Sequence, residues 1–125
     1  MVLQRGASDS AFAILGPVTW TVTFYSSGVE SDVLALPAGF VARFLRYAER
    51  MEVYGPDLGM PHTRAMGDGL FELRVKGAEG IARVFYCTVV TRRIVILHQF
   101  VKKSDKTPRK ELEVARRRLK EVKDV

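Results

Sequence analysis

Residues 70–101, "LFELRVKGAEGIARVFYCTVVTRRIVILHQFV", contain three runs that are rich in β-forming residues. In the first run, Leu70 to Lys76, apolar and charged residues alternate with the period of a strand that buries one face. The second run covers Ile81 to Val90 and the third covers Ile94 to about Val101. Only "GAEG" and "TRR" separate the runs, and connections this short join antiparallel neighbours. The stretch therefore predicts a three-stranded antiparallel meander.

The region before the meander predicts one strand and two helices. In "WTVTFY", residues 20–25, β-forming side chains alternate between two faces, as in a strand. From Val33 to Tyr54 the apolar residues recur with a helical period. Pro37 fits the first turn of a second helical piece that follows a short one. Ser31 or Asp32 could cap the short helix.

The chain between and beyond these elements predicts a loop and a last helix. "GPDLGMPHTRAMGDG", residues 55–69, is rich in Gly and Pro and predicts a loop. Thr107 and Pro108 form a typical N-cap and first helical position. The stripe of the helix that follows comprises Leu112, Ala115, Leu119 and Val122.

These elements predict the α+β class. A small antiparallel sheet, made of the N-terminal strand and the meander, packs with the N-terminal helices and the C-terminal helix. Residues 1–18 show no clear period and are expected to form a loosely ordered N-terminal extension. Residues 19–125 are expected to form a single domain, because a chain of 125 residues has room for one core of moderate size.

The charge distribution indicates an anionic partner. The chain has a net charge of +6, and from Gln99 to Val125 ten Lys or Arg residues face five Asp or Glu residues. Nearly all of the excess charge therefore lies in the last quarter of the sequence. Nucleic acid, a membrane surface or an acidic protein would fit this charge. The alternative is a solvated helix face without a partner.

Cysteine and histidine usage limits the other function classes. Cys87 is the only cysteine, so no intrachain disulfide can form and a reducing, cytoplasmic location is expected. Cys87 lies in an apolar run, which favours a small buried side chain over a nucleophile. Two His and one Cys do not suffice for the usual zinc sites, so no metal is expected. No apolar run approaches the roughly 20 residues that a membrane span requires.

The first strand of the meander carries the candidate chemistry. Alternation places Glu72, Arg74 and Lys76 on one face. Arg83 on the next strand could lie beside Arg74 if the register allows it. Two cations side by side destabilise a sheet unless an anion bridges them, so the pair points to a phosphate site. The alternative is an ordinary solvated sheet face.

The segment after the third strand is a second candidate. "FVKKSDKTP", residues 100–108, places Lys102, Lys103 and Lys106 beside the expected start of a helix, where partial positive charge adds to theirs. The alternative is a charged loop that caps the helix. His98 lies in an apolar strand, a position more typical of a satisfied core or edge residue than of a catalyst.

Three segments carry a resemblance to a known group of proteins. "GLFELRVKG", "ARVFY" and "IVILHQFVKKSDKTPRKELEVARRRLKE" resemble the RelE/HigB superfamily of toxins from type II toxin–antitoxin systems, in its phage-derived RelE-like branch. The resemblance runs from about Trp20 to the C-terminus. It implies a RelE-like fold and a ribosome-dependent mRNA endonuclease (an mRNA interferase) that uses no metal or cofactor. It also implies a helix-turn-helix antitoxin as partner, in a toxin–antitoxin hetero-oligomer or alongside a homo-oligomer.

The resemblance also assigns roles to residues. In such enzymes the 2′-hydroxyl of the RNA attacks the adjacent phosphate. Arg83 would contact the scissile phosphate, Arg74 would orient the RNA, and Lys103 would stabilise charge. The remaining expected RNA contacts are Lys76, Lys102, Lys106 and His98. The sequence departs from the pattern in two ways, because no Tyr, His or Trp follows His98 and Glu72 stands where some members carry a basic residue.

Two alternatives remain open at this point. A ParE-like member of the same fold would poison DNA gyrase without cutting anything, and an inactive relative would only bind its antitoxin. An exposed cleft lined by Arg74, Arg83 and Lys103 would favour the nuclease. A buried or scattered Arg74–Arg83 pair would favour the gyrase poison.

Overall fold

The computed structural model of the chain describes residues 19–102 and 107–123. Its elements are β1 (Thr21–Phe24), α2 (Ser27–Leu34), α3 (Ala38–Tyr54), β2 (Thr63–Gly67), β3 (Leu70–Gly77), β4 (Gly80–Val89), β5 (Arg93–Lys102) and α4 (Arg109–Lys123). The predicted α+β class is confirmed. The expected N-terminal extension, residues 1–18, lies outside the described residues.

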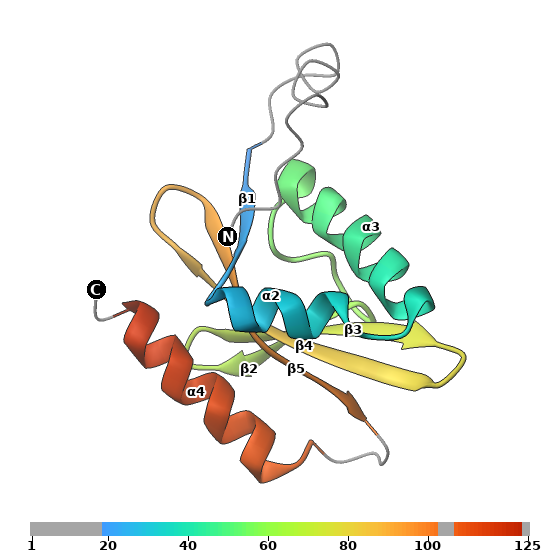
Figure 1. Ribbon diagram of the computed structural model, residues 1–125. Coiled ribbons are helices and arrows are strands. Elements are labelled where there is room, and N and C mark those ends of the chain that lie inside the picture. Colours follow the sequence, from blue (N-terminus) through green and yellow to red (C-terminus); the bar gives the residue numbers. More distant parts are fainter. Residues whose placement is uncertain (1–18, 103–106, 124–125) are drawn as a thin grey trace.

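The described strands form one sheet with the order β1-β5-β4-β3-β2 (Figure 1). The predicted meander is confirmed, since β3, β4 and β5 pair antiparallel in succession. The sheet is nevertheless mixed rather than purely antiparallel, because β1 runs parallel to β5, with Thr21 opposite Arg93. The chain leaves β1 through α2 and α3 and enters the sheet again at the opposite edge. The chain therefore comes to lie beside β1 only when it forms β5, the last strand.

The prediction of a loop over residues 55–69 is wrong in part, because this range contains the strand β2. Residues 63–67 pair antiparallel with β3, and Thr63 lies opposite Leu73. Asp68 and Gly69 form the turn that joins the two strands, and both have positive φ angles. The sequence predicts a loop here because the segment has no run of β-forming residues. Its backbone is held in the extended form by hydrogen bonds to β3.

α2 begins earlier than predicted. Ser26 is its N-cap, with an extended backbone and a side-chain oxygen that accepts a hydrogen bond from Val29 N at 3.2 Å. Ser31 and Asp32 lie inside the helix, so the prediction that one of them caps it is wrong. The Ser26 side chain thus satisfies one of the backbone N–H donors at the start of the helix. Gly28, in the first turn, has no side chain and does not contribute to this stabilisation. The predicted break before the second helix is confirmed, because α3 begins directly after Pro37.

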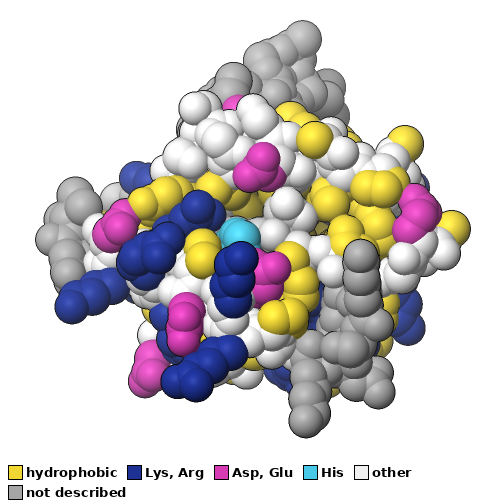
Figure 2. Space-filling model, turned by 60° about the horizontal axis from the view of Figure 1, so that its bottom comes forward, with side chains coloured by type: hydrophobic (Ala, Val, Ile, Leu, Met, Phe, Trp, Pro, Cys, Tyr) yellow, Lys and Arg dark blue, Asp and Glu magenta, His cyan; other side chains and the backbone are white. Residues whose placement is uncertain are grey.

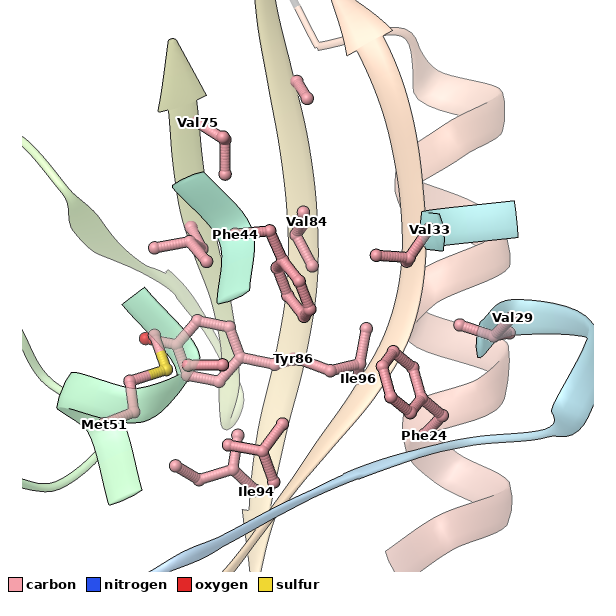
Figure 3. Packing of buried hydrophobic residues seen from close by; sticks show 14 of the residues in the cluster. Phe24, Val29, Val33, Phe44, Met51, Val75, Val84, Tyr86, Ile94 and Ile96 are labelled. Atoms are coloured by element: carbon pink, nitrogen blue, oxygen red, sulfur yellow. The ribbon is translucent and has the colours of Figure 1, made fainter. Parts of the chain in front are cut away.

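The larger core lies between the sheet and the layer of α2 and α3 (Figures 1 and 3). Phe44 and Met51 of α3 and Val33 of α2 point toward the sheet, where they meet side chains such as Tyr86. Tyr86 is fully buried, and its hydroxyl donates a hydrogen bond to Pro56 O at 2.6 Å. The predicted packing role of Tyr86 is thus confirmed.

α4 covers part of the opposite face of the sheet. Its buried residues Ala115 and Leu119 pack with Phe85, Cys87 and Leu97. Leu112 and Val122, also in the predicted stripe, are partly buried against the same cluster. Cys87 is the small buried side chain that the sequence predicts, and burial raises the pKa of its thiol. No helix within the described ranges is long and apolar enough to cross a membrane.

Candidate nucleic-acid interface

The candidate residues that belong to the described strands lie on the α4 side of the sheet, where the strand register arranges them in three rows. The rows are Arg64, Glu72, Phe85 and His98, then Arg74, Arg83 and Phe100, then Lys76, Ile81 and Lys102. Partners in a row have side chains about 5 Å apart. The predicted juxtaposition of Arg74 and Arg83 is therefore confirmed.

Arg83 already has an anionic partner within the chain. Its Nη1 donates a hydrogen bond to Glu72 Oε1 at 2.5 Å. The Arg83 side chain is only 5% exposed and that of Glu72 is 0% exposed. A buried charge needs such a partner, because its removal from water is costly. The anion that the sequence argument expected beside Arg83 is thus supplied by the protein itself.

Arg64 is a residue of this site that the sequence argument missed. It lies on β2, the edge strand, opposite Glu72. Its Nη2 is 3.4 Å from the same Glu72 Oε1 that binds Arg83, yet its side chain is 47% exposed. The sequence does not point to Arg64, because the Gly- and Pro-rich composition of residues 55–69 predicts a loop. The sequence does hold one signal for a hairpin here, the pair Asp68-Gly69 directly before β3.

Several polar atoms of this cluster lack hydrogen-bond partners. Within the described part of the chain, Arg74 Nε, Arg83 Nε and Glu72 Oε2 are buried and unpaired. Arg74 as a whole is partly exposed. Each Nε carries one N–H donor, and two such donors on neighbouring strands can be satisfied together by an oxyanion. Both guanidinium groups therefore keep a donor that no described protein atom satisfies.

His98 is held by α4. Its Nε2 lies 2.8 Å from Glu111 Oε1, and the pair joins β5 to the start of the helix. This position agrees with the alternative reading of His98 as a satisfied edge residue. Its expected contact with RNA remains a prediction.

The expected lysines are placed only in part. Lys76 is exposed at the end of β3, and Lys102 is the last residue of β5, opposite Ile81. Lys103 and Lys106 lie outside the described residues. The predicted lip of cations beside the sheet thus remains a prediction.

The charge on this side of the molecule is mixed. Figure 2, seen from the side at the bottom of Figure 1, shows Lys and Arg side chains interleaved with Asp and Glu rather than gathered in a uniform patch. Around the Arg74–Arg83 pair, however, cations prevail, since Arg64 and Lys76 flank the pair and Glu72 is the one carboxylate in the three rows. Among the described residues, no group of three or more His, Cys, Asp or Glu is arranged to hold a metal ion.

Comparison with known proteins identifies the family. A model of the family "phage derived protein Gp49-like" matches residues 31–120. The chain belongs to this family. The predicted membership of the RelE/HigB toxin superfamily, in its phage-derived branch, is thereby confirmed.

A solved structure supports the fold of the Gp49-like chain. The archaeal RelE–RelB complex from Pyrococcus horikoshii OT3 contains a chain that is similar with a TM-score of 0.51 and 22% sequence identity. The match covers 68% of the Gp49-like chain and 97% of the other. The likeness shows that the fold is RelE-like. No curated protein matches the sequence.

Proposed function

We propose that the Gp49-like chain is the toxin of a type II toxin–antitoxin system and cuts mRNA on the ribosome, in the cytoplasm. The observation that carries this proposal is the Arg74–Arg83 pair, flanked by further cations, in a chain of a RelE/HigB-like family. Net positive charge on the sheet attracts a phosphate backbone.

The proposed reaction needs only the RNA and side chains of the protein. The 2′-oxygen attacks the adjacent phosphorus, a base takes the hydroxyl proton, and the 5′-oxygen leaves with a proton. Arg74 would orient the RNA, and Arg83 would use its unpaired Nε on the scissile phosphate. Lys103 would stabilise the developing charge. Lys76, Lys102, Lys106 and His98 would contact the rest of the strand.

Arg74 is the best residue for a test, because it is partly exposed and has no carboxylate partner among the described residues. The wild type and Arg74→Ala would be induced in a bacterial host, followed by primer extension on a reporter mRNA. We expect growth arrest with in-frame cuts in translated message only, both lost in Arg74→Ala. The matched control is Arg43→Ala, an exposed arginine of α3, which should cut as the wild type does. Cuts that persist in Arg74→Ala would exclude Arg74 from the mechanism.

The burial of Arg83 favours a second candidate function. A buried arginine pair is expected to favour a ParE-like gyrase poison, and Arg83 is 5% exposed and bound to Glu72. That protein would arrest growth without cutting RNA. The same experiment separates the two, because arrest without cuts, together with inhibited supercoiling by purified gyrase, would replace the nuclease by the gyrase poison. The absence of arrest would leave an inactive relative.

A neutralising antitoxin is the proposed partner. The solved relative is described as a RelE–RelB complex, and a basic toxin needs an inhibitor for its host to survive. We expect the chain to co-purify with a helix-turn-helix protein encoded by the neighbouring reading frame. Co-expression of that frame should abolish growth arrest. A neighbour that neither binds nor protects would contradict this part of the proposal.

A further inference from the structure

Glu72 has two arginine partners of unequal kind. The inner partner, Arg83, is 5% exposed and forms a direct hydrogen bond of 2.5 Å. The outer partner, Arg64, is 47% exposed and approaches the same oxygen to 3.4 Å. Only a small movement would bring Arg64 into hydrogen-bond range, and its long side chain on an edge strand is free to make it. Glu72 therefore has a reserve partner close at hand.

Arg83 has donors that Glu72 does not use. Glu72 takes Nη1, whereas Nε is buried and unpaired in the described part of the chain. Arg74, directly opposite on β3, has an unpaired buried Nε as well. A buried donor without an acceptor is unfavourable, so both arginines gain when an oxyanion arrives. The site is thus only partly satisfied in the free protein.

We propose that Glu72 is a positioning residue that exchanges its arginine partner when a phosphate binds. In the free protein Glu72 holds Arg83. When a phosphate of the RNA enters between Arg74 and Arg83, the Arg83 guanidinium turns toward it, and Arg64 takes over Glu72. The inference rests on the proposed function for the identity of the phosphate, which belongs to an RNA backbone.

The exchange follows from charge balance. Arg83 cannot leave Glu72 unaided, because a fully buried carboxylate without a partner is strongly destabilising. With Arg64 in place, three arginines face one carboxylate and one phosphate, so each anion keeps a cation. Arg64 would therefore promote phosphate binding without touching the phosphate.

A double-mutant cycle tests this indirect role. The full chain would be titrated with a single-stranded RNA oligonucleotide whose 2′-hydroxyls are methylated, so that no cleavage occurs. We expect Arg64→Ala to weaken binding about tenfold in the wild type and less than about twofold in the Glu72→Gln background, because no carboxylate then needs a reserve partner. Arg64→Lys should restore much of the affinity. Arg43→Ala, on the opposite side of the sheet, is the control.

Two outcomes of the double-mutant cycle would contradict the exchange of arginine partners. If Arg64→Ala weakens binding equally in both backgrounds, Arg64 contacts the RNA directly and the exchange is wrong. If Arg64→Ala has no effect in the wild type, the exchange is also wrong. If Arg64 contacted a phosphate directly, Arg64→Ala would in addition lower the salt dependence of binding, whereas the exchange leaves that dependence unchanged.

A second measurement needs no substitution at Glu72 and so does not depend on the folding of that variant. Inorganic phosphate would be added to the wild-type protein, and the Nε–H signals of its arginines would be followed by NMR. The exchange predicts that the signals of Arg64, Arg74 and Arg83 shift together with one binding curve. Shifts of Arg74 alone would overturn it. Since neither measurement uses ribosomes or cleavage, a protein that shows the exchange yet cuts no mRNA would refute only the proposed nuclease.

Discussion

Arg83 owes its position to a carboxylate on the neighbouring strand. Glu72 is diagonal to Arg83 in the β3–β4 pair and directly opposite Arg64 of β2. One buried acidic side chain thus organises two arginines from different strands, and a third, Arg74, completes the cluster. We expect substitutions here to change both stability and the proposed phosphate binding, so the two effects have to be separated by design.

Arg83→Ala is expected to lower the free energy of unfolding by about 3 kcal/mol, because it leaves Glu72 buried without its nearest partner while Arg64 stays within reach. Urea denaturation followed by circular dichroism measures this change. The double variant Glu72→Leu/Arg83→Met should recover most of the loss, since apolar side chains of similar volume often replace a buried pair at little cost. A wild-type midpoint for Arg83→Ala would show that the pair contributes little.

The sequence allowed part of this cluster to be predicted. A hairpin between two alternating strands was enough to place Arg74 beside Arg83. The partner of Arg83 could not be predicted, because alternation puts Glu72 and Arg74 on the same face without deciding which of them Arg83 meets. The burial of the Glu72–Arg83 pair and the contribution of Arg64 depend on β2, a strand that residue propensities alone do not reveal.

At the scale of elements, β3 and α3 pack closely where Gly77 meets Phe40. A Cβ atom on Gly77 would lie 2.5 Å from Cε1 of Phe40, a core residue that is 1% exposed. Gly77 ends β3, directly before the turn into β4, and its missing side chain lets the start of α3 pack onto the hairpin.

Gly77→Ala should therefore destabilise the protein by about 1 to 3 kcal/mol, because Phe40 has to move within a packed core. Gly39→Ala is the matched control, since a Cβ there meets no atom within 4 Å and Ala favours the helix. That variant should be as stable as the wild type or slightly more so. Thermal unfolding of the two variants tests both statements, and equal melting temperatures would show that the core yields easily at Phe40.

Elements with a regular pattern were predicted within one or two residues, and those without one were not. β3 and α4 show a clear period of apolar residues, whereas β4 and β5 are continuous apolar runs because their two faces pack into the two core clusters. β2 has no such face, since it lies at the sheet edge and most of its residues are exposed. The start of α2 was misplaced because Gly28 suggests a turn, whereas the cap at Ser26 allows the helix to begin there.

At the scale of the whole molecule, binding to RNA should depend steeply on salt. We expect four cations of the described strands to contact four phosphates, namely Arg74, Arg83, Lys76 and Lys102. The logarithm of the binding constant should then fall linearly with the logarithm of the salt concentration, with a slope of about −2 to −3. Fluorescence anisotropy with a methylated RNA measures the slope. Lys76→Ala should reduce its magnitude by about 0.7, whereas Arg43→Ala should leave it unchanged. A slope near zero would argue against a phosphate-binding face.

The overall topology was predicted only in outline. Short connections indicated the meander, but nothing in "WTVTFY" specifies which strand it joins or in which direction. That choice is made by packing: Val22 and Phe24 enter the core beneath α2 and α3, while the β1 backbone pairs with β5. Parallel pairing between distant segments leaves no local pattern to read.

The pairing of β1 with β5 has a consequence for the synthesis of the chain. Residues 21–24 leave the ribosome long before their partners at 93–96 have been translated. Until then Val22 and Phe24 have no strand beside them, and the helical layer covers only part of a sheet. Contacts that span most of a sequence form late, so the native structure is completed after β5 has emerged. For the proposed ribosome-dependent nuclease, this order predicts that no active toxin forms on a ribosome before the ribosome has made β5.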